Sequence, residues 1–298
     1  MESVKRNFSI KDLENLSGIK AHTIRIWEKR YNIFTPNRTS KNIRFYDSTT
    51  LQKILNISLL NENGYKISRI SKLNDTEINK LVYNISSKTG AQTRIINSFK
   101  LAMIRFNEED FEDVYQEILK EKEFEEIFTQ YFIPLLQEVG ILWQTDTLQP
   151  IHEHFLVNII KEKIYTNNAL VKQSQKKEQK KHTFILFLPE NEIHDLSLLF
   201  LQHTLLKKGF RVIFLGQNLT IRDLKLTLKQ YPKAQFVTFC TIEPQNIGNF
   251  VNEFQQLINI NSNTLHILGH KAPQFLEYTV IPSIKVHQNL DEFISNLP

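Results

Sequence analysis

The stretch TFILFLPENEIHDLS, residues 183–197, joins an apolar run to a polar turn, and a second apolar segment follows at residues 198–206. The run predicts a strand that is buried on both faces, and the longer segment after the turn predicts a helix. Downstream, further patterns alternate in the order strand 210–216, helix 220–231, strand 234–240, helix 245–259, strand 264–269, strand 282–286 and helix 290–297. This alternation predicts a parallel sheet with helices on both faces, so residues 181–298 are expected to form a Rossmann-like (flavodoxin-like) domain.

An imidazole between carboxylates occupies the turn after the first predicted strand. Glu192 and Asp195 flank His194, and ligands in such sheets bind at the carboxyl ends of the strands. The turn is therefore a candidate binding site. The same residues also fit an ordinary helix start at which the ring of His194 bonds only to nearby carboxylates, and the turn taken alone leaves these two interpretations equal.

The segment upstream of the sheet carries a different pattern. Residues 92–171 contain almost no helix breakers apart from Pro134, Gly140 and Pro150, and apolar residues recur at helical spacing. The pattern predicts a bundle of about four helices, a domain over residues 90–172. The charged segment VKQSQKKEQKK then predicts a linker between the bundle and the sheet.

The N-terminal segment begins with two short helix patterns on either side of Gly18. Ser9 and Asp12 are the residues of a helix cap before the first of them. Two short helices joined by a glycine turn predict a helix-turn-helix. Residues 32–47 then predict a hairpin with basic side chains, so residues 1–75 are expected to form a winged helix-turn-helix.

The positive charge of the chain is concentrated at its N-terminus. The net charge is +5, and residues 1–73 contain fourteen Lys or Arg against six Asp or Glu, which is +8 and leaves −3 for the rest. Such a concentration favours a polyanionic partner such as nucleic acid, although solvated lysines alone produce the same count.

Composition excludes several classes of protein. The single cysteine, Cys240, excludes an internal disulfide and a thiolate cluster. No apolar run approaches the roughly 20 residues of a membrane span, and the N-terminus has no signal-peptide core, so a cytoplasmic protein is expected. The sequence holds no P-loop, no Ser-His-Asp order and no convincing catalytic carboxylate pair, so we do not expect an enzyme.

An ordered set of residues runs through the second helix and the wing: Arg25, Trp27, Glu28, Arg30, Tyr31, Pro36, Arg38, Arg44 and Tyr46. The set resembles the winged helix-turn-helix of the MerR family of bacterial transcription regulators, which implies double-stranded operator DNA as a partner. Trp27 is expected in the core, and Glu28 with Arg30 fits a local ion pair. The residues expected at base edges or phosphates are Thr23, Arg25, Tyr31, Arg38, Lys41 and Arg44.

The predicted bundle carries Trp143 ten residues before Glu153, which His154 follows directly. Taken alone, Trp143 fits a core residue, and Glu153 with His154 fits a surface pair. The triplet HEH at residues 152–154 also suggests a metal site. Two histidines at that spacing point about 200° apart on a helix, however, and make a poor chelate.

The order of Trp143, Glu153 and His154, followed by Glu-x-His-x-x-(small) after the first strand, resembles the cobalamin-binding modules of corrinoid proteins. More narrowly, it resembles MerR-type regulators that bind adenosylcobalamin, of which the best known are light-responsive repressors. The resemblance implies adenosylcobalamin (or methylcobalamin) as the cofactor, with His194 as the lower axial ligand of cobalt. It further implies that Glu192 and Asp195 tune the imidazole and that the bundle residues cap the upper face.

The chain departs from this pattern at four places. Ser197 stands where the family prefers glycine, the polar residue after the third strand corresponds to Thr238 or Thr241, and the paired glycines after the fourth strand are reduced to Gly269 before a histidine. The light-responsive members carry a His after the bundle Trp, and here it is Gln144, a poor cobalt ligand. His152 or His154 would have to replace it.

The resemblance implies a DNA-binding transcription regulator, a repressor, whose oligomerisation as a dimer or tetramer and whose operator affinity depend on adenosylcobalamin, with light as a further signal. The alternative is a MerR-type regulator with a degenerate cobalamin domain that responds to a protein partner or another ligand, and Ser197, Gln144 and Gly269 favour it. A corrinoid methyl carrier is disfavoured by the N-terminal DNA-binding module.

Overall fold

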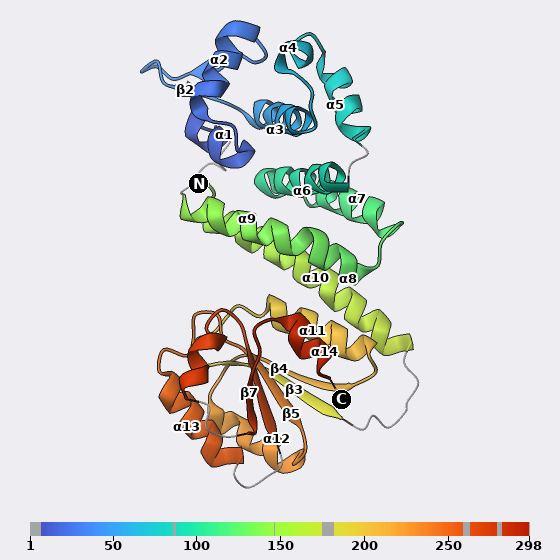
Figure 1. The fold of residues 1–298 in the computed structure, drawn as a ribbon, viewed down its shortest axis with the longest axis vertical. Coiled ribbons are helices and arrows are strands. Elements are labelled where there is room, and N and C mark those ends of the chain that lie inside the picture. Colours follow the sequence, from blue (N-terminus) through green and yellow to red (C-terminus); the bar gives the residue numbers. More distant parts are fainter. Residues whose placement is uncertain are drawn as a thin grey trace. The chain divides into compact units, whose positions relative to one another are not determined.

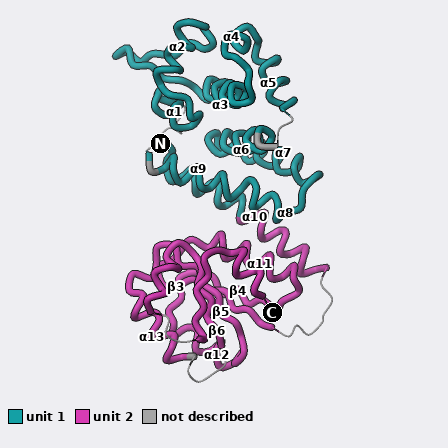
Figure 2. Tube along the Cα trace, viewed as in Figure 1, with its two compact units in different colours: residues 1–160 teal, residues 161–298 magenta. Residues whose placement is uncertain are grey.

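The computed structural model describes residues 7–85, 88–145, 147–174, 182–258, 263–278 and 282–297. The chain carries helices in its first half and a parallel sheet in its second half (Figure 1). It divides into two compact units, residues 1–160 and 161–298 (Figure 2). Three domains were predicted, and their boundaries stay predictions. No helix within the described ranges is long and apolar enough to cross a membrane.

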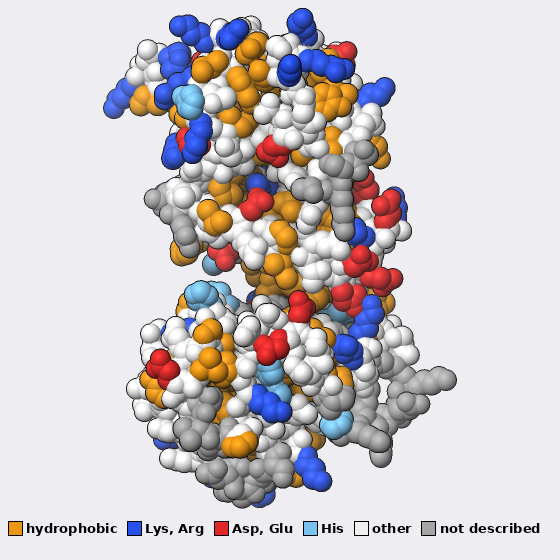
Figure 3. Space-filling view, viewed as in Figure 1, with side chains coloured by type: hydrophobic (Ala, Val, Ile, Leu, Met, Phe, Trp, Pro, Cys, Tyr) orange, Lys and Arg blue, Asp and Glu red, His pale blue; other side chains and the backbone are white. Residues whose placement is uncertain are grey.

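The helix-turn-helix opens unit 1. Ser9 and Asp12 close the start of α1 (Ile10–Ser17) with a capping box, and Gly18 ends it with a φ of 73° in the left-handed region. The following elements are α2 (Ala21–Tyr31), β1 (Asn37–Arg38), β2 (Arg44–Phe45), α3 (Ser48–Glu62), α4 (Ile67–Ile70) and α5 (Asp75–Tyr83). The two short strands pair antiparallel and form the wing, residues 37–45. Lys and Arg side chains gather over this domain (Figure 3).

Four helices form the bundle, and the third of them is composite. The elements are α6 (Lys88–Arg105), α7 (Glu108–Leu119), α8 (Phe124–Ile127), the π-helical turn η1 (Phe128–Phe132), α9 (Ile133–Gln144) and α10 (Pro150–Ser174). Phe99, Phe111 and Phe132 are fully buried at the centre, with ring centroids 4.4, 5.5 and 5.9 Å apart. The prediction of about four helices is confirmed.

Unit 2 contains a five-stranded parallel sheet. Its strands are β3 (Thr183–Pro189), β4 (Arg211–Leu219), β5 (Gln235–Phe239), β6 (Thr264–Leu268) and β7 (Ile284–Val286). Their order across the sheet is β4-β3-β5-β6-β7, and every neighbouring pair is parallel. Counted within the sheet this is 2-1-3-4-5, the flavodoxin-like order, which confirms the predicted fold.

Helices cover both faces of this sheet. They are α11 (Leu196–Lys207), η2 (Ile221–Leu224), α12 (Lys225–Gln230), α13 (Ile247–Ile258), η3 (Ala272–Glu277) and α14 (Leu290–Ser295). Alternate residues of β3 face opposite layers: Phe184 and Leu186 pack with α11 and α14, whereas Ile185 and Phe187 pack with α12 and α13. The unbroken apolar run of β3 therefore reflects burial on both faces.

Candidate ligand site and DNA-binding surface

The strand order of the sheet reverses between β3 and β5. The chain leaves β3 toward α11 on one face and leaves β5 toward α13 on the other face. The loop after β3, residues 190–195, and the loop after β5, residues 240–246, therefore diverge at the carboxyl edge of the sheet. Ligands of this fold bind at such a switch point.

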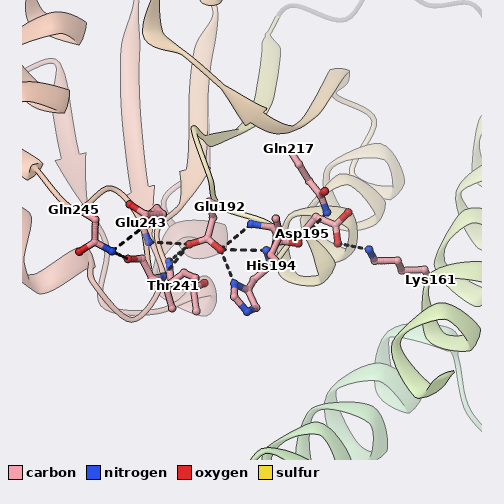
Figure 4. A network of polar contacts seen from close by, with 10 residues as sticks. Lys161, Glu192, His194, Asp195, Gln217, Thr241, Glu243 and Gln245 are labelled. Atoms are coloured by element: carbon pink, nitrogen blue, oxygen red, sulfur yellow. Dashed lines mark hydrogen bonds and ion pairs between the residues drawn. The ribbon is translucent and has the colours of Figure 1, made fainter. Parts of the chain in front are cut away.

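One buried carboxylate joins these two loops. The Glu192 side chain is fully buried, and it accepts five backbone N–H hydrogen bonds (Figure 4). Three reach Oε2 from the loop after β5, at 2.9, 2.8 and 3.1 Å, and are donated by Thr241, Ile242 and Glu243. Two reach Oε1 from the carboxylate's own loop, each at 3.1 Å, and are donated by Ile193 and His194.

These donors decide the charge of Glu192. Burial by itself raises the pKa of a carboxyl group, but the N–H groups of Ile242 and Glu243 and the ring of His194 outweigh it and lower the pKa of Glu192 to about 2. At neutral pH the carboxylate is therefore ionised and only accepts hydrogen bonds.

The ring of His194 is oriented by this carboxylate. Its Nδ1 lies 2.5 Å from Oε1 of Glu192. Because the carboxylate has no proton to give, Nδ1 of the neutral imidazole carries the hydrogen and donates it, which leaves the lone pair on Nε2. The His194 side chain is 44% exposed. The ring thus presents a nitrogen ligand whose tautomer is set by a buried partner.

Two carboxylates were predicted to tune His194, and among the described contacts only Glu192 touches the ring. Oδ1 of Asp195 instead lies 2.6 Å from Nζ of Lys161 on α10 (Figure 4). Gln217 of β4 also holds the loop, because its Nε2 donates to the carbonyl of Ile193 at 2.8 Å. Neither Lys161 nor Gln217 was foreseen, since nothing in their sequence neighbourhood indicates which loop they meet.

The polar positions predicted near the ligand have different surroundings. Ser197 is exposed in the first turn of α11, and Thr241 lies in the loop beside Glu192. Thr238 lies inside β5 and is fully buried. Of the two threonines proposed for the position after the third strand, Thr241 alone follows it.

Gly269 is required by the contact between two strands. Its φ is 105°, and a Cβ at this position would lie 2.6 Å from the carbonyl oxygen of Cys240. The backbone of β6 therefore packs on the end of β5 too closely for any side chain, with or without a ligand. Burial raises the pKa of the Cys240 thiol, which makes it a poor nucleophile.

The bundle residues that were predicted to cap a ligand lie near the junction of α9 and α10. Trp143 is 49% exposed, so the interpretation of it as a core residue is wrong. Glu153 is half-buried and His154 is exposed. His152 is buried and its ring stacks on Phe106 at a centroid distance of 4.8 Å, which places it in the bundle core. The side chain of Gln144 lies outside the described ones.

The second helix of the helix-turn-helix has a buried face and an exposed face. Trp27 is 6% exposed and Ile24 is fully buried, which confirms the prediction for the tryptophan. Arg25 is exposed, and Thr23 is half-buried with its Oγ1 3.4 Å from Nε2 of His22. Arg25 is therefore the more accessible of the two residues proposed to contact bases.

Glu28 connects α2 to the wing. Its Oε1 lies 3.2 Å from Nε of Arg44, and its Oε2 accepts the hydroxyl of Tyr46 at 3.3 Å. The suggested ion pair with Arg30 is wrong, because the guanidinium of Arg30 lies over the ring of Tyr31 at 5.4 Å. Burial, followed by the charge of Glu28, raises the pKa of Tyr46 to about 12.

The tip of the wing is basic and exposed. Nη1 of Arg38 donates to Oδ1 of Asn42 at 2.8 Å, which holds the guanidinium beside the turn, and Lys41 is exposed. A groove of about 390 Å³ lies between α2 and the wing, lined by Arg25, Glu28, Lys29, Asn32, Phe34, Thr35, Pro36 and Arg44. Basic side chains on both sides of one groove fit contacts to phosphates.

Two regions of the chain match known families. Residues 8–77 match the MerR HTH family regulatory protein, and residues 95–166 match the B12 binding domain. The chain is 25% identical over 259 residues to the HTH-type transcriptional repressor CarH of Myxococcus xanthus, covering 85% of each protein.

A solved structure supports the fold of about two thirds of the chain. The monomethylamine corrinoid protein of Methanosarcina barkeri is 14% identical, with a TM-score of 0.50, over 66% of this chain and 94% of that protein. The similarity supports the fold of this part of the chain, a helical segment followed by an α/β domain. Residues 8–77 of the chain are therefore a MerR-type helix-turn-helix region, and residues 95–166 are a B12-binding-domain region, with distant homology of the whole to a repressor.

Proposed function

We propose that this regulator is a repressor whose oligomerisation and operator affinity are controlled by adenosylcobalamin, with His194 as the lower axial ligand of cobalt. The observation that carries the proposal is the bond between Nδ1 of His194 and the buried carboxylate of Glu192. Histidines that ligate metals almost always donate their other ring N–H to such a partner, which fixes the ring and raises its basicity.

A single histidine, His194, suits a metal ion whose other ligands come from a cofactor and not from the protein. Sites for free ions take three or four protein side chains, and the described residues contain no cluster of three His, Cys, Asp or Glu able to hold an ion. A single oriented imidazole is what a cobalt already enclosed by a corrin ring requires. Ser197 is compatible with this, because its side chain is exposed.

Three residues of the bundle are those to which the resemblance assigns the upper face of the cofactor. Trp143 offers an exposed aromatic surface, and Glu153 and His154 offer polar groups on the first turns of α10. When bound, adenosylcobalamin supplies a cobalt–carbon bond that light can break. Gln144 is a poor cobalt ligand, so capture of cobalt by the bundle after illumination would rest on His154, since His152 is buried.

The repressor assignment is supported by the relative from Myxococcus xanthus, whose name gives that activity to a protein aligned over 85% of the chain. The basic groove of unit 1 supports a double-stranded operator as the target. A dimer or tetramer is proposed because regulators of this class recognise symmetric DNA sites.

Binding of the cofactor in the dark is the deciding experiment. The purified protein is mixed with adenosylcobalamin, and in a parallel sample with methylcobalamin, and is passed through gel filtration. We expect the colour to elute with the protein and His194→Ala to change the absorption spectrum toward a cobalamin without a protein imidazole. His182→Ala is the control, because His182 is an exposed histidine of the same unit.

The alternative function predicts a different outcome. A wild-type protein that emerges colourless at saturating cobalamin supports the degenerate cobalamin domain and a protein partner or another ligand. If colour is retained, green light then tests the signal. Unchanged oligomer size and unchanged affinity for a DNA duplex, selected from a random library by the dark protein, would remove light from the proposal.

A further inference from the structure

Unit 2 holds a second set of polar contacts, between its part of α10 and the start of α11. Nζ of Lys161 lies 2.6 Å from Oδ1 of Asp195, the residue directly after His194 (Figure 4). Asp195 occupies the N-cap position of α11, and within the described structure its side chain makes no capping bond. The carboxylate is only 10% exposed. Its interaction is therefore directed to α10.

Further along the same two helices, three buried side chains meet. Nδ2 of Asn168 donates to Oε1 of Gln202 at 3.1 Å, and Oδ1 of Asn168 lies 3.0 Å from Nδ1 of His203. Asn168, Gln202 and His203 are 3, 7 and 2% exposed. Because water does not reach them, separating these groups would leave buried polar atoms unsatisfied, at a cost of about 1–3 kcal/mol each.

The spacing of the two contacts is the same on both helices. Lys161 and Asn168 are seven residues apart, and so are Asp195 and Gln202. Seven residues make two turns, about 10 Å, and return to the same helix face. The helices therefore run in the same direction with a matched register. Apolar faces tolerate a shift of one turn, but paired polar groups specify one register.

We propose that these five residues, the polar seam of Lys161, Asn168, Asp195, Gln202 and His203, position the loop that carries His194. Glu192 fixes the loop to the residues after β5, and Asp195 fixes it to α10. The same helix, α10, carries Glu153 and His154 near its start. Lys161 and Asp195 are thus positioning residues for the cobalt ligand. The statement about cobalt rests on the proposed function, and the statement about the loop does not.

Hydrogen exchange in the ligand-free full chain tests the loop. The informative amides are those of His194, which donates to Glu192, and Leu199, which donates to the carbonyl of Asp195 at 2.8 Å. In Lys161→Met we expect both amides to exchange about tenfold faster, because the opening of a local segment sets the rate. The charge-reversed double variant Lys161→Glu with Asp195→Lys should restore protection.

Cobalamin affinity is the second readout. Loss of a group that orients a metal ligand lowers affinity about 10- to 100-fold, so Lys161→Met should weaken binding in the dark by that factor, and the double variant should recover most of it. Lys172→Met, an exposed lysine near the end of the same helix, is the control that should leave exchange and affinity unchanged.

Two results would overturn the inference. Exchange at His194 and Leu199 that matches the wild type in Lys161→Met would show that the seam does not hold the loop. A double variant as impaired as the single one would show that the contact is not the ion pair. If the wild type fails to bind cobalamin, the proposed function fails, while the exchange measurement still decides the role of the seam.

Discussion

Two carboxylates hold functional loops in this protein, Glu28 in the helix-turn-helix and Glu192 in the sheet domain. Glu28 is bound by the side chains of Arg44 and Tyr46 and is partly exposed, and the side chain of Arg44 is 38% exposed. Glu192 is fully buried and is bound by five backbone N–H groups and one imidazole. Glu28 is therefore held by a charged side chain near water, whereas Glu192 is held mainly by backbone N–H groups whose positions the fold sets.

The difference predicts how each region responds to change. An ion pair near the surface contributes about 1 kcal/mol or less and is screened by salt. A buried carboxylate surrounded by backbone donors is insulated from salt, and its loss leaves those donors unsatisfied. The attachment of the wing should therefore weaken as salt rises, whereas the loop that carries Glu192 and His194 should keep one conformation.

The largest expected effect is at Glu192. Glu192→Ala should lower the free energy of unfolding of the sheet domain by about 3 kcal/mol and abolish stable cobalamin binding, because five backbone donors and the His194 ring lose their acceptor. Urea unfolding followed by circular dichroism gives the first quantity, and gel filtration with the cofactor gives the second. Glu190→Ala, an exposed neighbour, is the control, and equal losses in both variants would break the comparison.

The second largest effect is expected from acid, which should lower the stability of the sheet domain. Nδ1 of His266 and Nε2 of His287 lie 2.9 Å apart, and both rings are buried. Burial, the neighbouring His287 and then Lys285 lower the pKa of His266 to about 3. Between pH 6.5 and 3 the unfolded chain binds a proton that the folded chain does not, so stability is retained above pH 6.5 and lost below it.

At pH 5 we expect the sheet domain to be about 2 kcal/mol less stable than at pH 7.5, measured by its urea midpoint. His266→Phe should reduce this pH dependence, since phenylalanine keeps the aromatic contact with Phe293 and cannot be protonated. Exposed His182→Phe should keep the full dependence. A wild-type midpoint that does not move between the two pH values would contradict the assignment.

Sequence patterns were sufficient for the parts of the molecule in which one helix or strand decides the outcome. The apolar run of β3 and the Ser9–Asp12 cap have local causes, and both were predicted correctly. Partners that come from another element were not predictable. Glu28 meets Arg44 from sixteen residues away, and Asp195 meets Lys161 from thirty-four residues away. Only the folded chain decides those pairings.

Trp143 shows the same limit in a different form. Taken alone, Trp143 was expected in the core, because large aromatic side chains are usually buried. The residue is half exposed near the end of α9. The resemblance to cobalamin-binding modules instead assigns Trp143 to a surface that a ligand covers, and that assignment stays a prediction.

A smaller effect is expected at Glu28. Glu28→Gln removes the charge that Arg44 faces, keeps an acceptor for Tyr46, and should cost about 1 kcal/mol in the unfolding of the helix-turn-helix. Affinity for a duplex selected from a random library should fall several-fold, because the wing loses its attachment to α2. If the wild type and Glu28→Gln bind the duplex with the same affinity, both at low salt and at high salt, the wing is not held by this ion pair.

The smallest effect is expected at the tip of the wing, where the comparison becomes one of salt response. Lys41 is exposed, and Lys41→Ala should leave the thermal midpoint unchanged and weaken DNA binding about equally for all sequences. If Lys41 contacts one phosphate, the slope of log affinity against log salt should become shallower by about 1, because one fewer counterion is released. Lys172→Ala, exposed on α10, should leave that slope unchanged. A slope in Lys41→Ala equal to that of the wild type would mean that the wing tip lies away from the DNA. Lys41 and the control residue Lys172 would then contribute equally little to DNA binding.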